Sequence, residues 1–138
     1  MTAAVSNVTT AAPSKTLLWV GRAVSALPVL ALVASGLAKL THQPKLVEGL
    51  TQHYGFPADA ITVIAVLELV SILLYVVPQT AFFGAILVTA YLGGAVATHV
   101  RVGDPVTLPV ILGVLAWLGL YLRDGRLRAL APLRSRLE

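Results

Sequence analysis

The chain of 138 residues contains no cysteine. This absence excludes disulfide bonds, zinc or iron–sulfur sites ligated by cysteine, thiol redox chemistry and lipid anchors attached to cysteine. If the protein takes part in redox chemistry, the electrons must therefore pass through a partner protein or a bound organic cofactor.

Charge is scarce as well: 12% of the residues are charged and 57% are hydrophobic, with a mean hydropathy of +0.86. A soluble domain carries about 25% charged residues, and a domain this small could not bury so much apolar surface. A bilayer accommodates such a chain, because there the outside of the protein can be apolar too. The net charge of +4 then points to loop topology and anionic lipids, and we expect no nucleic-acid partner.

Recognisable motifs of catalysis and metal binding are also missing. The chain has no glycine-rich phosphate loop, no nucleophile elbow and no HExxH pattern. His42, His53 and Glu48 do not have the spacing of a metal site, so no metal is expected. The sequence leaves open whether the chain is an enzyme, and it establishes no cofactor.

Long apolar runs dominate what is present. They predict an all-α fold, namely an integral membrane bundle of four transmembrane helices over residues 16–122. The expected spans are about 16–40, 60–77, 80–100 and 106–122. We expect residues 1–15 to be a disordered tail and residues 123–138 to be a basic cytoplasmic tail that contacts anionic lipids. The first run exceeds the roughly 7–15 apolar residues of a signal peptide, so we do not expect cleavage.

A short helix is expected between the first two spans. Pro44 suits a first helical turn, and Gly55 suits a C-terminal stop. Leu46, Leu50 and Tyr54 fall on one face, a pattern that fits a helix lying in the membrane interface. An ordinary structured loop is the alternative interpretation.

The basic residues predict the orientation, because they accumulate in cytoplasmic segments. With four spans, both termini lie on one side. That side carries six flanking basic residues, namely Lys15, Arg123, Arg126, Arg128, Arg134 and Arg136. The other side carries three, namely Lys39, Lys45 and Arg101. We therefore expect a multi-pass protein of the bacterial plasma membrane with cytoplasmic N- and C-termini. Trp19, Tyr54, Tyr75 and Tyr121 lie near span ends, as interfacial aromatic residues do.

Glu68 is the most informative residue, because a carboxylate near the middle of a span must be protonated, paired or adjacent to a polar cavity. Ser71 and Tyr75 share its helix face, which predicts a polar stripe turned into the bundle. A polar intramembrane site can then be drawn from residues near the non-cytoplasmic end, namely Lys39, Glu68, Tyr91, His99 and Arg101. The alternatives are a structural ion pair at Glu68 and, for the basic residues, simple contact with lipid head groups.

Small residues on the third span form two overlapping small-xxx-small patterns, Ala90 with Gly94 and Gly93 with Ala97. Such spacing allows helices to pack closely, within one subunit or between subunits. A homo-oligomer is therefore one expected assembly.

Several segments of the chain share the pattern of one known family, and the most specific is the third-span segment Tyr91-Leu92-Gly93-Gly94-Ala95-Val96-Ala97-Thr98-His99-Val100-Arg101. The others are Gly21-Arg22, Ser35-Gly36 with Lys39-Leu40, Glu68-Leu69 with Pro78, Gly84-Ala85-Ile86-Leu87 and Trp117-Leu118-Gly119-Leu120-Tyr121-Leu122-Arg123. Together they resemble the DoxX-like family of bacterial four-helix membrane proteins. The likeness extends over about residues 19–133. It implies a membrane subunit linked to quinone-dependent redox or oxidative-stress complexes, and it implies no established catalytic residues.

Three hypotheses follow. In the first, the chain is a membrane subunit or binder of a quinone-like lipophilic molecule that serves a redox protein partner, with Glu68 and Tyr91 orienting the ligand. In the second, it is a membrane assembly protein without a small ligand, whose polar groups only fix helix packing. In the third, it is a small oligomeric transporter or a membrane enzyme that acts on a lipophilic substrate. The resemblance alone ranks the first hypothesis highest.

Overall fold

The computed structural model describes residues 14–130, and the regular structure in this part is entirely helical, which confirms the all-α class. The helices are α1 (Lys15–Leu40), α2 (Pro44–Glu48), the π-helix η1 (Gly49–His53), α3 (Ala58–Val76), α4 (Ala81–Val102), α5 (Thr107–Arg123) and α6 (Gly125–Leu130). The Ser14 hydroxyl caps α1 by accepting a hydrogen bond from the Leu17 amide. The tails expected before residue 14 and after residue 130 lie outside the described residues.

Helices α1, α3 and α4 are long and apolar enough to cross a membrane. Helix α5 is apolar but has 17 residues, so its helical length is about 25 Å against roughly 30 Å of hydrocarbon. The outward faces of all four helices carry exposed large aliphatic or aromatic side chains, such as Leu30, Leu67, Phe83 and Val114. Water would disfavour this surface, whereas lipid accommodates it.

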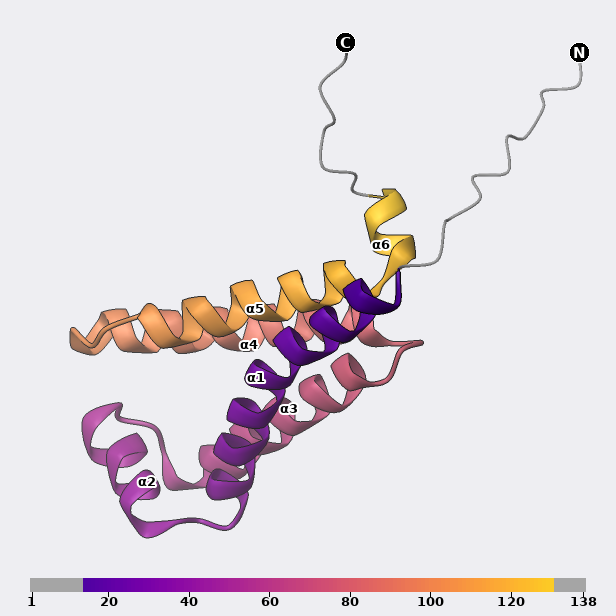
Figure 1. The fold of residues 1–138 in the computed structure, drawn as a ribbon. Helices are drawn as coiled ribbons and strands as arrows, with labels where there is room; N and C mark the ends of the chain where they lie inside the picture. Colours follow the sequence, from indigo (N-terminus) through magenta and orange to yellow (C-terminus); the bar gives the residue numbers. More distant parts are fainter. Residues whose placement is uncertain (1–13, 131–138) are drawn as a thin grey trace, which may run out of the picture.

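The four long helices form two pairs that diverge. Figure 1 shows α1 beside α3 and α4 beside α5, with the pairs meeting near the chain termini and separating toward α2. We call the end that holds Lys15 and Arg123 the closed end, and the end that holds α2 and η1 the open end. Helix α1 also packs against α5, and α3 also packs against α4.

Glycines draw the two pairs together at the closed end. A Cβ added to Gly84 of α4 would lie 2.1 Å from the Tyr75 amide nitrogen of α3, and one added to Gly119 of α5 would lie 2.8 Å from the Ser25 amide nitrogen of α1. One added to Gly21 would lie 2.7 Å from the Arg123 amide nitrogen. Backbones this close leave no room for a side chain, so these three glycines fix the contact between the pairs.

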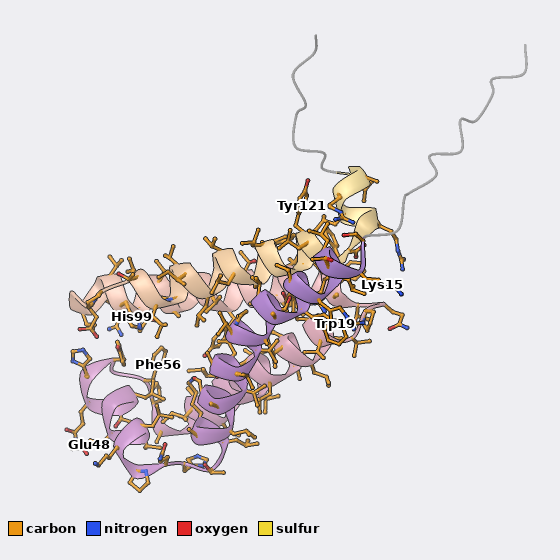
Figure 2. All side chains as sticks on the ribbon, in the orientation of Figure 1. Lys15, Trp19, Glu48, Phe56, His99 and Tyr121 are labelled. Atoms are coloured by element: carbon orange, nitrogen blue, oxygen red, sulfur yellow. The ribbon has the colours of Figure 1, made fainter. Side chains whose placement is uncertain are left out.

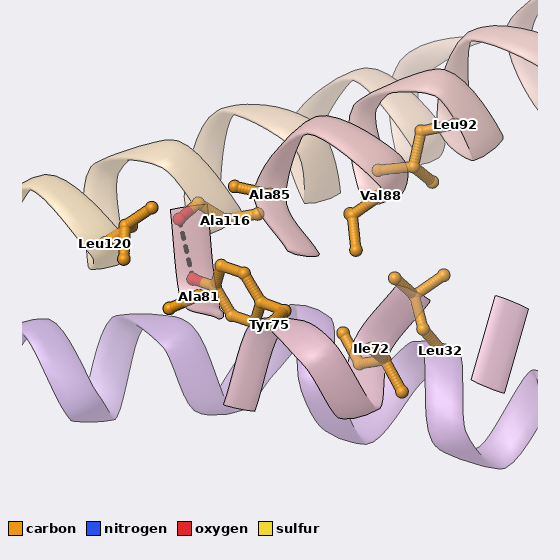
Figure 3. Close-up of a cluster of buried hydrophobic side chains, with 9 residues drawn as sticks. All are labelled: Leu32, Ile72, Tyr75, Ala81, Ala85, Val88, Leu92, Ala116 and Leu120. Carbon is orange, nitrogen blue, oxygen red and sulfur yellow. Dashed lines mark hydrogen bonds between the residues drawn. The ribbon is translucent and has the colours of Figure 1, made fainter. Parts of the chain in front are cut away.

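Tyr75 lies in the core at this end. Figure 3 shows its ring among apolar side chains of α1, α3, α4 and α5. Its hydroxyl donates to the Ala116 carbonyl at 2.6 Å and lies 3.0 Å from the Ser25 hydroxyl. The placement of Tyr75 in the membrane interface was wrong, since its side chain is fully buried. Proximity to a span end misled that inference, because the hairpin turn after α3 folds α4 directly over the ring.

The segment between α1 and α3 differs from the single short helix expected. It begins as α-helix at Pro44 but continues as a π-helical turn from Gly49 to His53. Gly55 ends it with a φ of +71°, a conformation that glycine adopts readily. The wider turn changes the direction of the last residues, and it brings Tyr54 to the loop between α4 and α5.

Candidate functional site

A buried ion pair joins α1 to α3. The Lys39 ammonium donates to Glu68 Oε2 at 2.8 Å, and the two side chains are 8% and 1% exposed. The same ammonium donates to the Tyr91 hydroxyl of α4 at 3.2 Å and to the Ser35 hydroxyl one turn back on α1. Lys39 therefore does not extend to the lipid head groups, and three helices meet at its nitrogen.

The local sequence explains why the pair is buried. Glu68 lies on the α3 face that also holds Ser71 and Tyr75, and all three are buried, as the expected polar stripe requires. On α1, a Cβ added to Gly36 would lie 2.7 Å from Leu69 Cδ2, so this glycine lets α1 and α3 approach beside the pair. Two charges removed from water in this way are stable only as partners.

A cavity of about 440 Å³ borders the ion pair at the open end. This volume is in the usual range of ligand pockets, roughly 300–1,000 Å³. Its polar groups include Ser35, Lys39, Glu68, Tyr91 and His99. The remaining lining is mainly apolar and comes from α1, the η1 region, α3, α4 and α5, namely Leu32, Leu50, Phe56, Ile64, Ala90, Leu92, Ala95, Leu108, Pro109 and Leu112. Figure 2 labels His99 and Phe56 on the two sides of this opening.

The α2–η1 segment is tied to the loop after α4. Asp104 accepts hydrogen bonds from the Tyr54 hydroxyl and the His53 imidazole, both at 2.8 Å. Arg101 donates to the Tyr54 carbonyl, and the rings of Tyr54 and His99 lie 5.4 Å apart. The hydrogen bonds from Tyr54 and His53 hold the pKa of Asp104 below its usual value. The pKa of Tyr54 is raised, first by partial burial of its hydroxyl and then by the hydrogen bond to Asp104 and the negative charge of that residue.

The structure thus brings together Lys39, Glu68 and Tyr91, and it places His99 on the cavity wall. The His99 Nδ1–H donates to the Pro105 carbonyl at 2.9 Å, which fixes the ring on that wall. Arg101 is exposed, and its guanidinium contacts the backbone after η1 instead of the ion pair.

Comparison with known families decides the identity. The sequence model of the DoxX-like family matches residues 23–119, a stretch that contains the ion pair, the cavity-lining helices and most of α5. The chain belongs to the DoxX-like family. No curated protein and no solved structure matches it. The family resemblance expected from the third-span segment is confirmed, and this DoxX-like chain is a multi-pass membrane protein.

Sequence reasoning missed two residues that make polar contacts at the open end of this DoxX-like protein. Asp104 was overlooked because a single carboxylate in a Gly-Asp-Pro loop is an ordinary turn. Ser35 was named only as part of the family resemblance, although its hydroxyl accepts a hydrogen bond from Lys39. Metal-ligand clusters are absent from residues 14–130, and His42 instead lies 3.3 Å from the Thr62 hydroxyl.

The small-xxx-small residues predicted on α4, namely Ala90, Gly93, Gly94 and Ala97, make no close helix contact within residues 14–130. A Cβ added to Gly93 or Gly94 would meet nothing within 4 Å there, and Ala90 and Ala97 are exposed. Close packing occurs instead at Gly21, Gly84 and Gly119. Gly94 and Ala90 border the cavity, whereas Gly93 borders an apolar groove between the outer faces of α4 and α5.

Proposed function

We propose that this DoxX-like membrane protein binds a lipophilic small molecule with a polar head group, of the quinone type, in the cavity at its open end. One observation carries the proposal: the buried Lys39–Glu68 pair borders an apolar cavity of ligand size. Close packing at Gly36 already joins α1 to α3 beside the ion pair. The charged groups also line the cavity that opens where the two helix pairs separate.

The lining supports the same assignment. Most of the wall is aliphatic or aromatic, which suits a ring or an alkyl chain, and the polar groups gather around one end. Ligand sites commonly combine an apolar wall with a few polar groups that fix orientation. Because the chain lacks cysteine, we assign any electron transfer to such a ligand to a redox partner protein.

We further propose four spans with both termini in the cytoplasm of a bacterium. Lys39 is buried in the ion pair, so it does not count as a flanking charge. Among residues 14–130, the open end then has Lys45 and Arg101, whereas the closed end has Lys15, Arg22, Arg123, Arg126 and Arg128. This difference strengthens the positive-inside bias. The arginines of α6 would contact anionic lipids, each contributing about 1 kcal/mol.

A membrane assembly role is the second candidate, and one observation favours it. Gly93 and Ala97 lie exposed on α4, where a helix of another copy could approach closely. In that case, the oligomer would persist in mild detergent and would dissociate on Gly93→Leu.

The adjacent glycines of α4 provide a matched test of ligand binding. The full chain is extracted in mild detergent, and bound small molecules are identified by native mass spectrometry and organic-phase analysis. Gly94→Leu places an isobutyl group into the cavity, whereas Gly93→Leu places the same group into the outer groove. We expect a stoichiometric lipophile in the wild type and in Gly93→Leu, and its loss in Gly94→Leu. An empty wild-type protein, or equal occupancy in both variants, would contradict the proposal.

A further inference from the structure

The Lys39 ammonium has no hydrogen left for a ligand. An ammonium carries three N–H donors. In the described part of the chain, Lys39 also has three acceptors: the Ser35 hydroxyl, Glu68 Oε2 and the Tyr91 hydroxyl. A ligand carbonyl that entered the cavity would therefore have to displace one of these acceptors to reach the cation.

Glu68 presents the opposite situation. Its Oε1 is buried and has no hydrogen-bond partner among residues 14–130, although its other oxygen is paired. The side chain is 1% exposed, and it lines the cavity. A buried carboxylate oxygen without a donor is unfavourable, and the penalty is relieved by any donor that reaches it. Glu68 Oε1 therefore requires a hydrogen-bond donor at this end of the cavity.

We propose that the ligand is an uncharged molecule whose head group carries a hydroxyl, and that this hydroxyl donates to Glu68 Oε1. The ion pair is neutral overall, so it favours an uncharged head over an ion. Among quinone-type ligands, the site selects the quinol, which has O–H groups, over the quinone, which only accepts. This inference rests on the proposed ligand-binding function and specifies its ligand class.

Two probe molecules measure how much a head-group hydroxyl contributes to binding, because they differ only in that group. Para-hexylphenol carries an O–H on an apolar ring and chain, and para-hexylanisole is the same molecule with that hydrogen replaced by methyl. Binding of each to the full chain in detergent is measured by isothermal titration calorimetry. We expect the wild type to bind the phenol at least about tenfold more tightly than the ether.

Glu68→Gln tests the direction of the hydrogen bond. Lys39 keeps the amide oxygen on its own side, so the amide NH₂ takes the place of Oε1 and turns the acceptor into a donor. The preference for the phenol should then be lost, because the oxygen atoms of both probes can accept a hydrogen bond from the amide. Ser71→Ala is the matched control on the same helix face, since within residues 14–130 the Ser71 hydroxyl bonds to the Leu67 carbonyl of its own helix. It should leave the wild-type preference unchanged.

The outcomes separate this inference from the proposed function. A preference for the phenol that is present in the wild type and lost in Glu68→Gln supports both. Equal binding of the two probes by the wild type overturns the hydroxyl assignment and leaves the ligand-binding function standing. Absence of binding of either probe and of any co-purified lipophile overturns the function itself. If Glu68→Gln fails to fold, the ratio of the wild-type affinities for the phenol and the ether decides by itself whether the hydroxyl assignment holds.

Discussion

The closed and open ends of this protein are formed by the same four long helices, but they are held together differently. At the closed end, Gly21, Gly84 and Gly119 bring backbones into direct contact, and Tyr75 fills the remaining core. At the open end, the helix pairs separate around a cavity and are joined by the hydrogen bond from Lys39 to Tyr91 and by a polar loop contact. Packing specifies the fold at one end, while polar groups without tight packing leave room for a ligand at the other.

Removal of one member of the ion pair should have the largest effect on stability. Lys39→Met leaves Glu68 buried without a cation, which should lower the free energy of unfolding by about 3–5 kcal/mol. Thermal unfolding in detergent measures the loss. The double variant Lys39→Met/Glu68→Met should recover most of this stability, because apolar residues replace both charges, but it should not recover the phenol preference. A double variant as unstable as the single one would contradict this account.

Gly84→Ala should have the next largest effect. The new Cβ would lie 2.1 Å from the Tyr75 amide nitrogen, and a backbone atom cannot move aside cheaply. We expect a loss of about 2–3 kcal/mol, seen as a lower midpoint of thermal unfolding. Gly94→Ala at the open end is the control and should leave the midpoint unchanged. Equal effects of the two variants would remove the distinction between the ends.

Tyr75→Phe should have a moderate effect. It deletes the hydroxyl that bonds the Ala116 carbonyl inside the core, so stability should fall by about 1–2 kcal/mol. Tyr91→Phe removes a hydroxyl that accepts from Lys39 and lines the cavity, so it should change ligand affinity more than stability. The comparison fails if Tyr91→Phe destabilises the protein more than Tyr75→Phe does.

The polar contact between η1 and the α4–α5 loop should give the smallest effect, and it should depend on pH. The pKa of Asp104 is lowered in the folded protein, so its contribution is present above the unfolded value of 3.8 and is lost as the pH falls below it. The protection factors of the amides in residues 49–55, which are corrected for the intrinsic exchange rate at each pH, should therefore fall on acidification from neutral pH to below that value. In Asp104→Asn, exchange should already be high at neutral pH. A segment that stays equally protected in this variant would show that Asp104 does not hold it.

Sequence patterns predicted the helices well and the contacts between them unevenly. The apolar runs located the long helices because hydrophobic length is a local property. The stripe of Glu68, Ser71 and Tyr75 was correctly predicted to face inward from helical spacing alone. Which glycines touch another helix could not be read from spacing, because the small-xxx-small pattern on α4 marks the cavity and the outer groove, while isolated Gly84 makes the closest contact.

The candidate site shows the same limit. Helical phase placed Lys39, Glu68 and Tyr91 near one another, but it could not distinguish Lys39 in an ion pair from Lys39 at the lipid head groups. Arg101 has the same sequence signal as Lys39, yet it is exposed and bonded to the Tyr54 carbonyl. The π-helical turn before Tyr54 determines that contact, and no local sequence pattern predicted this turn.

Photolabelling tests the central claim, ligand binding at the open end, most directly. A para-hexylphenol with a diazirine in its alkyl chain is irradiated with the full chain in lipid nanodiscs, and the labelled residues are mapped by peptide mass spectrometry. The account predicts adducts on cavity residues such as Ile64 and Leu112 that excess para-hexylphenol suppresses. Leu67 faces the lipid one turn from Ile64 and is 58% exposed. Adducts found only on such lipid-facing residues, and not reduced by the competitor, would contradict the account.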